Sequence, residues 1–379
     1  MNRIEEITFG SVKAVSISAG DYEAIIIPQV GANLISLRNT KKEIDVLRTP
    51  ETYEELVKNP VLYGIPVLFF PNRIDRGIIK RNGLDIRLPL NDPTGTKHIH
   101  GFLHNKPWKV KACSLNIDCN NIVNCNNENF YSNNNNNIYN FECNNNFDPN
   151  DISSSAVCQC IFENHENTDI YEFFPFSFTA SLTYVLNSNG LVQIFEMQNT
   201  GCREMPFGLG YHIAFNVPYY KYGNAEKCRF RVSAGPKWEI NDEVLPTGRL
   251  FDEYEEKELL REKGIAACGI KFGKMSYISS PIKVDEGIFA GRNTSHGNTF
   301  HGAIIRDSSC KDSIVFETDK KFGHWVIWNG DGNSGFICIE PQTWAINAPN
   351  LDLDDEITGY QTLKPGCTIQ CINKIYIVE

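Results

Sequence analysis

Residues 178–197 give the clearest indication of fold class; they read FTASLTYVLNSNGLVQIFEM. Apolar residues occupy alternate positions from Phe178 to Leu186, with threonine and serine between them. This period of two is typical of a half-buried strand. The turn signal NSNG follows, and the apolar run resumes at Leu191. We therefore predict a β-hairpin here.

Short β-rich stretches of this kind recur along the chain without a regular alternation of strands and helices. They lie at residues 12–17, 22–27, 230–232, 314–317, 325–328, 335–339 and 368–378. We expect only two short peripheral helices, one capped by Thr49 and ending at Asn59-Pro60, the other within residues 250–263. The pattern predicts an all-β fold, a large antiparallel β-sandwich with few short helices.

One segment interrupts this pattern, at about residues 114–155. It is dominated by asparagine, with Asn133 to Asn137 in a row, and carries few charges. Such a low-complexity tract buries too little apolar surface to offset its ordering entropy. We interpret it as an inserted loop, and leave open that its aromatic residues hold part of it against the body. The chain, residues 1–379, is otherwise expected to form a single domain.

Composition excludes several classes of partner. Lys and Arg number 36 against 46 Asp and Glu, a formal charge of −10, and no long basic block is present, so we expect no nucleic-acid partner. No apolar run approaches the roughly 20 residues needed to cross a bilayer, so we expect no membrane partner. The first ten residues do not resemble a secretory signal, and the 13 cysteines include no C-x-x-C pair. We expect a cytoplasmic protein with reduced thiols; no oligomeric state is predicted.

Four polar clusters occur at predicted strand ends or turns, where functional groups commonly lie. They are Phe70-Pro71-Asn72-Arg73-Ile74, His98-Ile99-His100-Gly101, Phe207-Gly208-Leu209-Gly210-Tyr211-His212 and Glu340-Pro341-Gln342-Thr343-Trp344.

Each cluster has more than one interpretation when taken alone. Arg73 is compatible with a structural salt bridge or with an anchor for ligand oxygens. His98 and His100 would share a face of a strand and serve as packed histidines, as a metal pair with a glutamate, or as sugar-binding imidazoles. His212 is either a core residue or a ligand contact. Glu340 follows apolar residues, so its pKa is expected to rise toward the useful range of a general base.

Taken together and in order, the clusters closely resemble the aldose 1-epimerase (galactose mutarotase) family. The resemblance also includes Lys106-Pro107-Trp108, Tyr63 to Leu68, and the strand pair from Phe174 to Thr200, and it covers nearly the whole chain apart from the asparagine-rich insert. It implies a large antiparallel sandwich, often called a supersandwich, with a sugar site in an open groove.

The resemblance also implies roles for individual residues. Glu340 would be the general base and His212 the general acid, and no metal or organic cofactor is implied. The sugar hydroxyls would be held by the remaining site residues, which are Arg73, His100, Asn72 and an aspartate for which Asp285 is the candidate, with Glu286 adjacent to it. Trp344 is expected to narrow the groove or to stack on a pyranose face.

One departure from the family pattern concerns sugar preference. The family often has Pro-Tyr-Phe after the acid histidine, whereas this chain has Ile213-Ala214-Phe215. The function predicted from the sequence is interconversion of the α and β anomers of a free aldohexose, with a small-molecule sugar as the partner.

Three alternatives to this function stay open. One is a carbohydrate-binding or sensing protein without turnover, and another is a metal-dependent β-barrel enzyme that uses His98, His100 and Glu340. The third is an epimerase acting on a hexose 6-phosphate, because four cations follow Arg73: Arg76, Lys80, Arg81 and Arg87.

Overall fold

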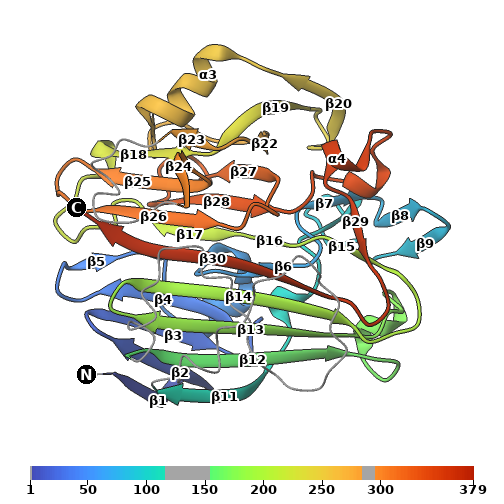
Figure 1. Ribbon diagram of the computed structural model, residues 1–379, viewed down its shortest axis with the longest axis horizontal. Helices are drawn as coiled ribbons and strands as arrows, with labels where there is room; N and C mark the ends of the chain where they lie inside the picture. The colour runs from blue at the N-terminus through green and yellow to red at the C-terminus, as the bar shows by residue number, and fades with distance from the viewer. Residues whose placement is uncertain (1, 116–153, 284–294) are drawn as a thin grey trace.

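The computed structural model describes residues 2–115, 154–283 and 295–379 (Figure 1). The largest sheet has nine antiparallel strands. Their order across the sheet is β11 (Lys109–Leu115), β12 (Ala156–Asn164), β13 (Phe178–Asn187), β14 (Gly190–Asn199), β30 (Thr368–Val378), β26 (Ser313–Thr318), β25 (Gly302–Asp307), β18 (Cys228–Val232) and β21 (Ile265–Ala266).

Two further sheets lie against the nine-stranded sheet. A five-stranded sheet has the order β1 (Arg3–Phe9), β2 (Val12–Ala19), β3 (Tyr22–Ile27), β4 (Asn33–Asn39) and β5 (Ile44–Asp45). An eight-stranded sheet has the order β20 (Pro246–Phe251), β19 (Ala234–Ile240), β22 (Met275–Ser279), β27 (His324–Trp328), β28 (Phe336–Gln342), β16 (Gly210–Tyr211) and β6 (Val67–Leu68), with β17 (Ile213–Asn216) also pairing with β28.

Four two-stranded pairs and a few short helices complete the described fold. The pairs are β7 (Arg73–Asp75) with β10 (Lys97–Ile99), β8 (Ile78–Arg81) with β9 (Leu84–Arg87), β15 (Met205–Phe207) with β29 (Gln361–Leu363), and β23 (Ile282–Lys283) with β24 (Ser295–Phe300). The helices are α1 (Tyr53–Lys58), α3 (Tyr254–Glu258) and α4 (Asp355–Thr358), with single turns at Pro60–Leu62, Leu103–Asn105, Asp169–Glu172, Ala225–Lys227, Leu259–Lys263 and Ala348–Asn350.

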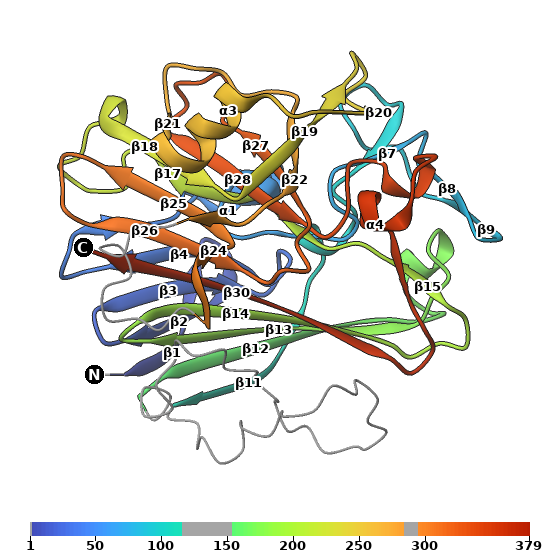
Figure 2. The same cartoon turned by 45° about the horizontal axis from the view of Figure 1, so that its top comes forward.

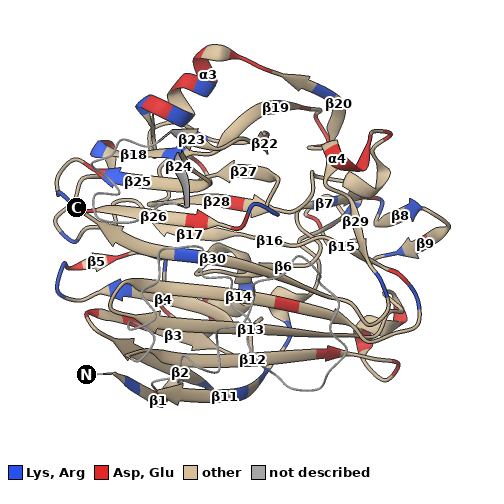
Figure 3. Ribbon diagram, in the orientation of Figure 1, with Lys and Arg blue, Asp and Glu red and all other residues tan. Residues whose placement is uncertain are grey.

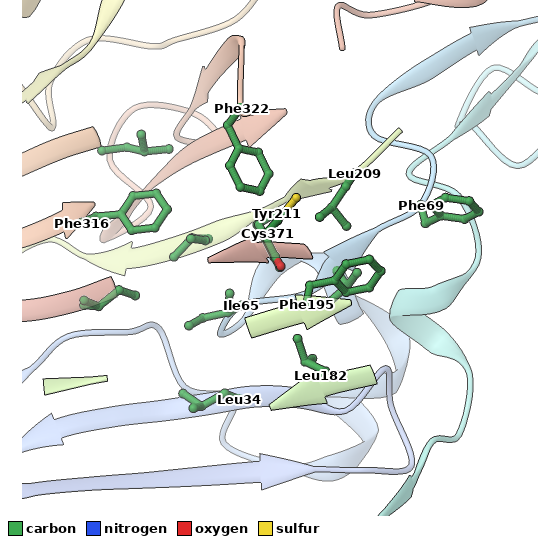
Figure 4. Packing of buried hydrophobic residues seen from close by; sticks show 14 of the residues in the cluster. Leu34, Ile65, Phe69, Leu182, Phe195, Leu209, Tyr211, Phe316, Phe322 and Cys371 are labelled. Atoms are coloured by element: carbon green, nitrogen blue, oxygen red, sulfur yellow. The ribbon is translucent and has the colours of Figure 1, made fainter. Parts of the chain in front are cut away.

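The three sheets share one hydrophobic core, which gives the molecule its layered form in Figures 1 and 2. The core cluster contains side chains from β4, β13, β14, β16, β26 and β30, and Figure 4 shows Leu34, Leu182, Phe195, Tyr211, Phe316 and Cys371 pointing toward one another. The phenol of Tyr184 on β13 donates a hydrogen bond of 2.9 Å to the carbonyl of Ala32, which also joins the layers.

The predicted hairpin is confirmed as β13 and β14, whose register pairs Phe178 with Asn199 and Asn187 with Gly190. The all-β class with few short helices is confirmed as well. The asparagine-rich insert joins β11 to β12, which pair at Leu115 and Ala156; most of it lies outside the described residues. No helix among the described residues is long and apolar enough to span a membrane.

Both predicted helices were placed incorrectly at their first residues. The first begins after Thr52 rather than Thr49, because the Thr52 hydroxyl accepts a hydrogen bond of 3.1 Å from the Glu55 amide. The second is shorter than residues 250–263, because β20 continues through Phe251 and pairs with β19.

Candidate active site

His212 and Glu340 lie opposite each other on adjacent strands of the eight-stranded sheet. Strands β16 and β17 pair with β28 in one register, Gly210 with Gln342 and Ile213 with Ile339, so that His212 falls across from Glu340. Alternate residues of β28, such as Ile339, belong to the main core. The face that carries Glu340 therefore points away from that core.

The two side chains are in direct contact. His212 Nε2 lies 3.2 Å from Glu340 Oε1, and only 6% and 2% of the respective side chains are exposed. Burial raises the pKa of Glu340 to about 8, opposed by the charge of Arg73 and a hydrogen bond from Gln342. Burial also lowers the pKa of His212 to about 4. Near neutral pH the pair therefore consists of a protonated carboxyl and a neutral imidazole, which share one titratable proton.

Gln342 is the polar neighbour of Glu340 on the same face of β28. Its Nε2 donates a hydrogen bond of 3.4 Å to Glu340 Oε2, and its Oε1 is buried without a partner among the described residues. This contact leaves Oε1 of the carboxyl directed at His212 and occupies the other oxygen.

The raised pKa of Glu340 makes a prediction about stability. The folded chain holds this proton more tightly than the unfolded chain, where a glutamate titrates near 4.5. The resulting stabilisation is complete below pH 4.5 and is lost as the pH rises to about 8. We expect the Tm of the wild type to fall relative to Glu340→Gln across this window, by a few degrees (roughly 1.4 kcal/mol per pKa unit). Thermal melts at half-unit pH intervals check this; parallel curves for the two proteins would contradict it.

Arg73 is the cation of the site and is half-buried on β7. Burial lowers the pKa of Arg73, while the charges of Asp92 and Glu340 raise it. Asn72, buried and with φ of +55°, accepts hydrogen bonds at its Oδ1 from the Arg73 amide (3.0 Å) and from Nη1 (3.2 Å). No carboxylate of the described residues lies within 4.0 Å of this guanidinium, and among those residues only Asn72 accepts a hydrogen bond from it, which leaves donors that suit ligand oxygens. These contacts favour the anchor interpretation over a structural salt bridge.

His100 approaches His212 from the loop after β10. The two imidazole rings are 5.3 Å apart and nearly perpendicular. The backbone of His100 has φ of +62° and is held by two hydrogen bonds. Its N–H donates to the Asn72 carbonyl at 2.9 Å, and its carbonyl lies 3.2 Å from His104 Nδ1. Gly101 is required next to it, since a Cβ there would lie 1.8 Å from the Phe69 carbonyl oxygen. Burial keeps the pKa of His100 well below its usual range, so this ring is neutral.

Trp344 lies beneath the site rather than on its surface. Its indole has no exposed surface and stacks between Phe70 and Tyr360, with ring centroids 4.9 Å and 6.1 Å away. It also fills the space that a side chain at Gly208 would need. We therefore expect Trp344 to support the loop of Arg73 by packing, because a ring buried on both faces cannot stack on a sugar.

The two candidates for the predicted sugar-binding acid are not placed by the structure. Asp285 and Glu286 lie outside the described residues. The role of either acid toward a sugar therefore stays a prediction.

His98 is buried and contacts the backbone before β10 rather than His212 or Glu340. Its Nδ1 is 2.7 Å from the Pro89 carbonyl, and burial lowers its pKa. His100 follows β10 in a left-handed conformation, so the shared strand face predicted for the two histidines ends at Ile99. Within the described part of the chain, no group of three His, Cys, Asp or Glu side chains is arranged to hold a metal ion.

The cations downstream of Arg73 are mostly engaged elsewhere. Arg81 donates to the carbonyls of Leu351 and Leu353 and pairs with Asp355. Arg76 and Arg87 pair with the aspartates at positions 75 and 85. Figure 3 shows the basic segments of β8 and β9 near the acidic α4, away from β28. They do not form a phosphate site around Glu340.

Sequence reasoning missed Trp328, which ends β27 on the same face as Glu340. The register pairs Val326 with Glu340 and Trp328 with Cys338. Trp328 is therefore on the same face as Glu340, two residues further along the strand pair. Its ring lies 5.7 Å from that of His212. The alternation in His324-Trp325-Val326-Ile327-Trp328 predicts that Trp328 and Val326 share one face of a strand. Only the pairing of β27 with β28 shows that this is also the face of Glu340.

Comparisons with known proteins find similar sequences and similar folds. A sequence model of the family described as aldose 1-epimerase matches residues 13–128 and 126–372. A galactose mutarotase-like protein from Clostridium acetobutylicum has a crystal structure with 32% identity and a TM-score of 0.84, covering 99% of this chain and 98% of that one. Galactose 1-epimerase from Lactobacillus acidophilus NCFM shares the fold at 15% identity, with a TM-score of 0.66 over 100% and 98% of the two chains. The uncharacterized protein YihR of Escherichia coli K12 is 23% identical over 69% of this chain and 68% of its own length.

Proposed function

Because the chain belongs to the aldose 1-epimerase family, we propose that it interconverts the α and β anomers of a free aldohexose. The observation that carries this proposal is the buried contact of 3.2 Å between His212 Nε2 and Glu340 Oε1. An acid and a base that face each other, with an arginine and a second histidine beside them, suit a reaction that moves two protons at one end of a sugar.

The proposed reaction opens and recloses the pyranose ring. Ionised Glu340 accepts the proton of the anomeric hydroxyl while protonated His212 donates to the ring oxygen, and the bond between the anomeric carbon and the ring oxygen breaks. The aldehyde then rotates about its bond to the second carbon. The reverse proton transfers close the ring on either face, and Glu340 and His212 return to their starting states.

The proton that His212 and Glu340 share can lie on either residue, and ring opening and ring closure each need it on a different one. The closed-ring complex needs the proton on His212, whereas the open-chain complex needs it on Glu340. Desolvation favours the second, neutral arrangement in the free protein. The two arrangements differ only by a transfer across the 3.2 Å contact, so a sugar that offers hydroxyls to the ionised pair would select the active one without exchange of protons with solvent.

Arg73 and His100 are proposed to hold the sugar hydroxyls so that both transfers occur within reach. Asn72 would act through Arg73, whose guanidinium it orients. Asp285, or Glu286 beside it, remains the proposed acid for a further hydroxyl. The engagement of Arg76, Arg81 and Arg87 by aspartates supports a neutral sugar over a hexose 6-phosphate.

We also propose that residues 1–379 act as a single cytoplasmic domain. The shared core of the three sheets supports one cooperative unit. The ten cysteines in the described ranges are all free thiols, as is typical of a reducing compartment.

Polarimetry tests the proposed activity. Freshly dissolved α-D-galactose and α-D-glucose should reach anomeric equilibrium faster with the protein than in buffer. The corresponding 6-phosphates should be accelerated less, because the arginines at 76, 81 and 87 are paired with aspartates in the described part of the chain. Saturable sugar binding without acceleration would identify a carbohydrate-binding protein instead. Faster turnover of the phosphates would overturn the assignment of a neutral sugar.

A further inference from the structure

Trp328 is an aromatic side chain on the site face that the proposed proton transfers do not use. Its indole meets the His212 ring at 62° with centroids 5.7 Å apart, and it packs against Phe336 at 5.6 Å. With Ala214 and Cys338 it forms a small apolar cluster separate from the main core. The side chains beside His212 on this face of the sheet are therefore apolar and aromatic.

Trp328 differs from every other tryptophan of the chain in its exposure. The other four are at most 3% exposed; they are Trp108, Trp238, Trp325 and Trp344. Trp328 alone is partly exposed. Part of this residue is thus accessible to solvent, whereas the other four tryptophans are covered by protein.

The indole nitrogen of Trp328 is available as well. Among the described residues Nε1 has no hydrogen-bond partner, and it is not one of the buried unpartnered atoms. An indole N–H can only donate, and a buried one normally finds an acceptor. The indole nitrogen of Trp328 is therefore at least partly accessible to solvent.

We propose that Trp328 is a sugar-binding residue, on whose indole the C–H face of the pyranose packs while Nε1–H meets a sugar hydroxyl. The inference rests on the proposed function, since it assigns a platform to that same site. A pyranose with mostly equatorial hydroxyls presents C–H groups on its ring faces, and these suit the negative face of an aromatic ring. Contact at the ring face leaves the anomeric oxygens to His212 and Glu340.

Fluorescence quenching by acrylamide tests the placement directly. The wild type should show one accessible tryptophan component, which Trp328→Phe should lack. Saturating D-galactose or D-glucose should shield that component, whereas galactitol at equal concentration, which has no ring, should not. If the protein accelerates the mutarotation of galactose but galactose leaves the quenching of its tryptophans unchanged, the inference is overturned and the proposed function stays intact. If the sugar shields Trp328 from acrylamide but the protein does not accelerate mutarotation, the inference is supported and the proposed function is overturned.

Steady-state kinetics separates binding from a merely structural role. Trp328→Ala should raise KM roughly three- to tenfold with kcat nearly unchanged, and Trp328→Phe, which keeps a ring, should restore most of the loss. Tyr222→Ala, which removes an exposed aromatic ring outside the site, should change neither constant. A fall in kcat at constant KM in Trp328→Phe would mean that the indole only supports His212, and would overturn the inference.

Discussion

Replacing Glu340 by glutamine should lower the kcat of mutarotation by two to four orders of magnitude, the typical range for a single acid–base group. The amide has nearly the same shape and can keep the contact with Gln342. It cannot accept the anomeric proton, because a carboxamide oxygen is a far weaker base than a carboxylate. The loss should therefore appear in kcat, with KM changed little.

The matched control for this substitution is Glu196→Gln. Glu196 is half-buried on β14 of the nine-stranded sheet and bonds to Ser181 and Gln370, so the same chemical change occurs away from the site. Its activity should equal that of the wild type. If Glu340→Gln is folded by circular dichroism and keeps a third or more of the wild-type kcat, Glu340 is not the base.

The fold class could be predicted because alternation is a local property of the chain. In β13 the side chains from Phe178 to Leu186 that alternate toward the core are all buried, as their spacing indicated. The pairing of strands distant in the sequence is not local. That β14 lies beside β30, and that three sheets share one core, depends on packing across the whole chain.

The proximity of four of the proposed site residues could be predicted, but their surroundings could not. Arg73, His100, His212 and Glu340 are separated by up to 267 positions in the chain, yet the structure brings them to one region. Trp344 and Trp328 show the limit. Trp344 follows β28 and Trp328 ends β27, and only the tertiary packing determines that the first is covered on both faces while the second is partly exposed.

Replacing His212 should have the second large effect on activity, and the pH dependence of kcat/KM should reveal it. In the wild type, kcat/KM should follow a bell with limbs near the pKa values of the pair, about 4 and about 8. Below the lower limb both groups are protonated and no acceptor exists. Above the upper limb the pair has lost its shared proton and no donor exists.

His212→Asn should lower kcat by two to four orders of magnitude and remove the alkaline limb. With no imidazole to donate, water must supply the proton at any pH, and the residual rate should rise as Glu340 ionises and then stay level. His165→Asn, a change at an exposed histidine, should keep the complete bell. An alkaline limb that persists in His212→Asn would show that another group protonates the ring oxygen, because the loss of activity at high pH would then not belong to the proton shared by His212 and Glu340.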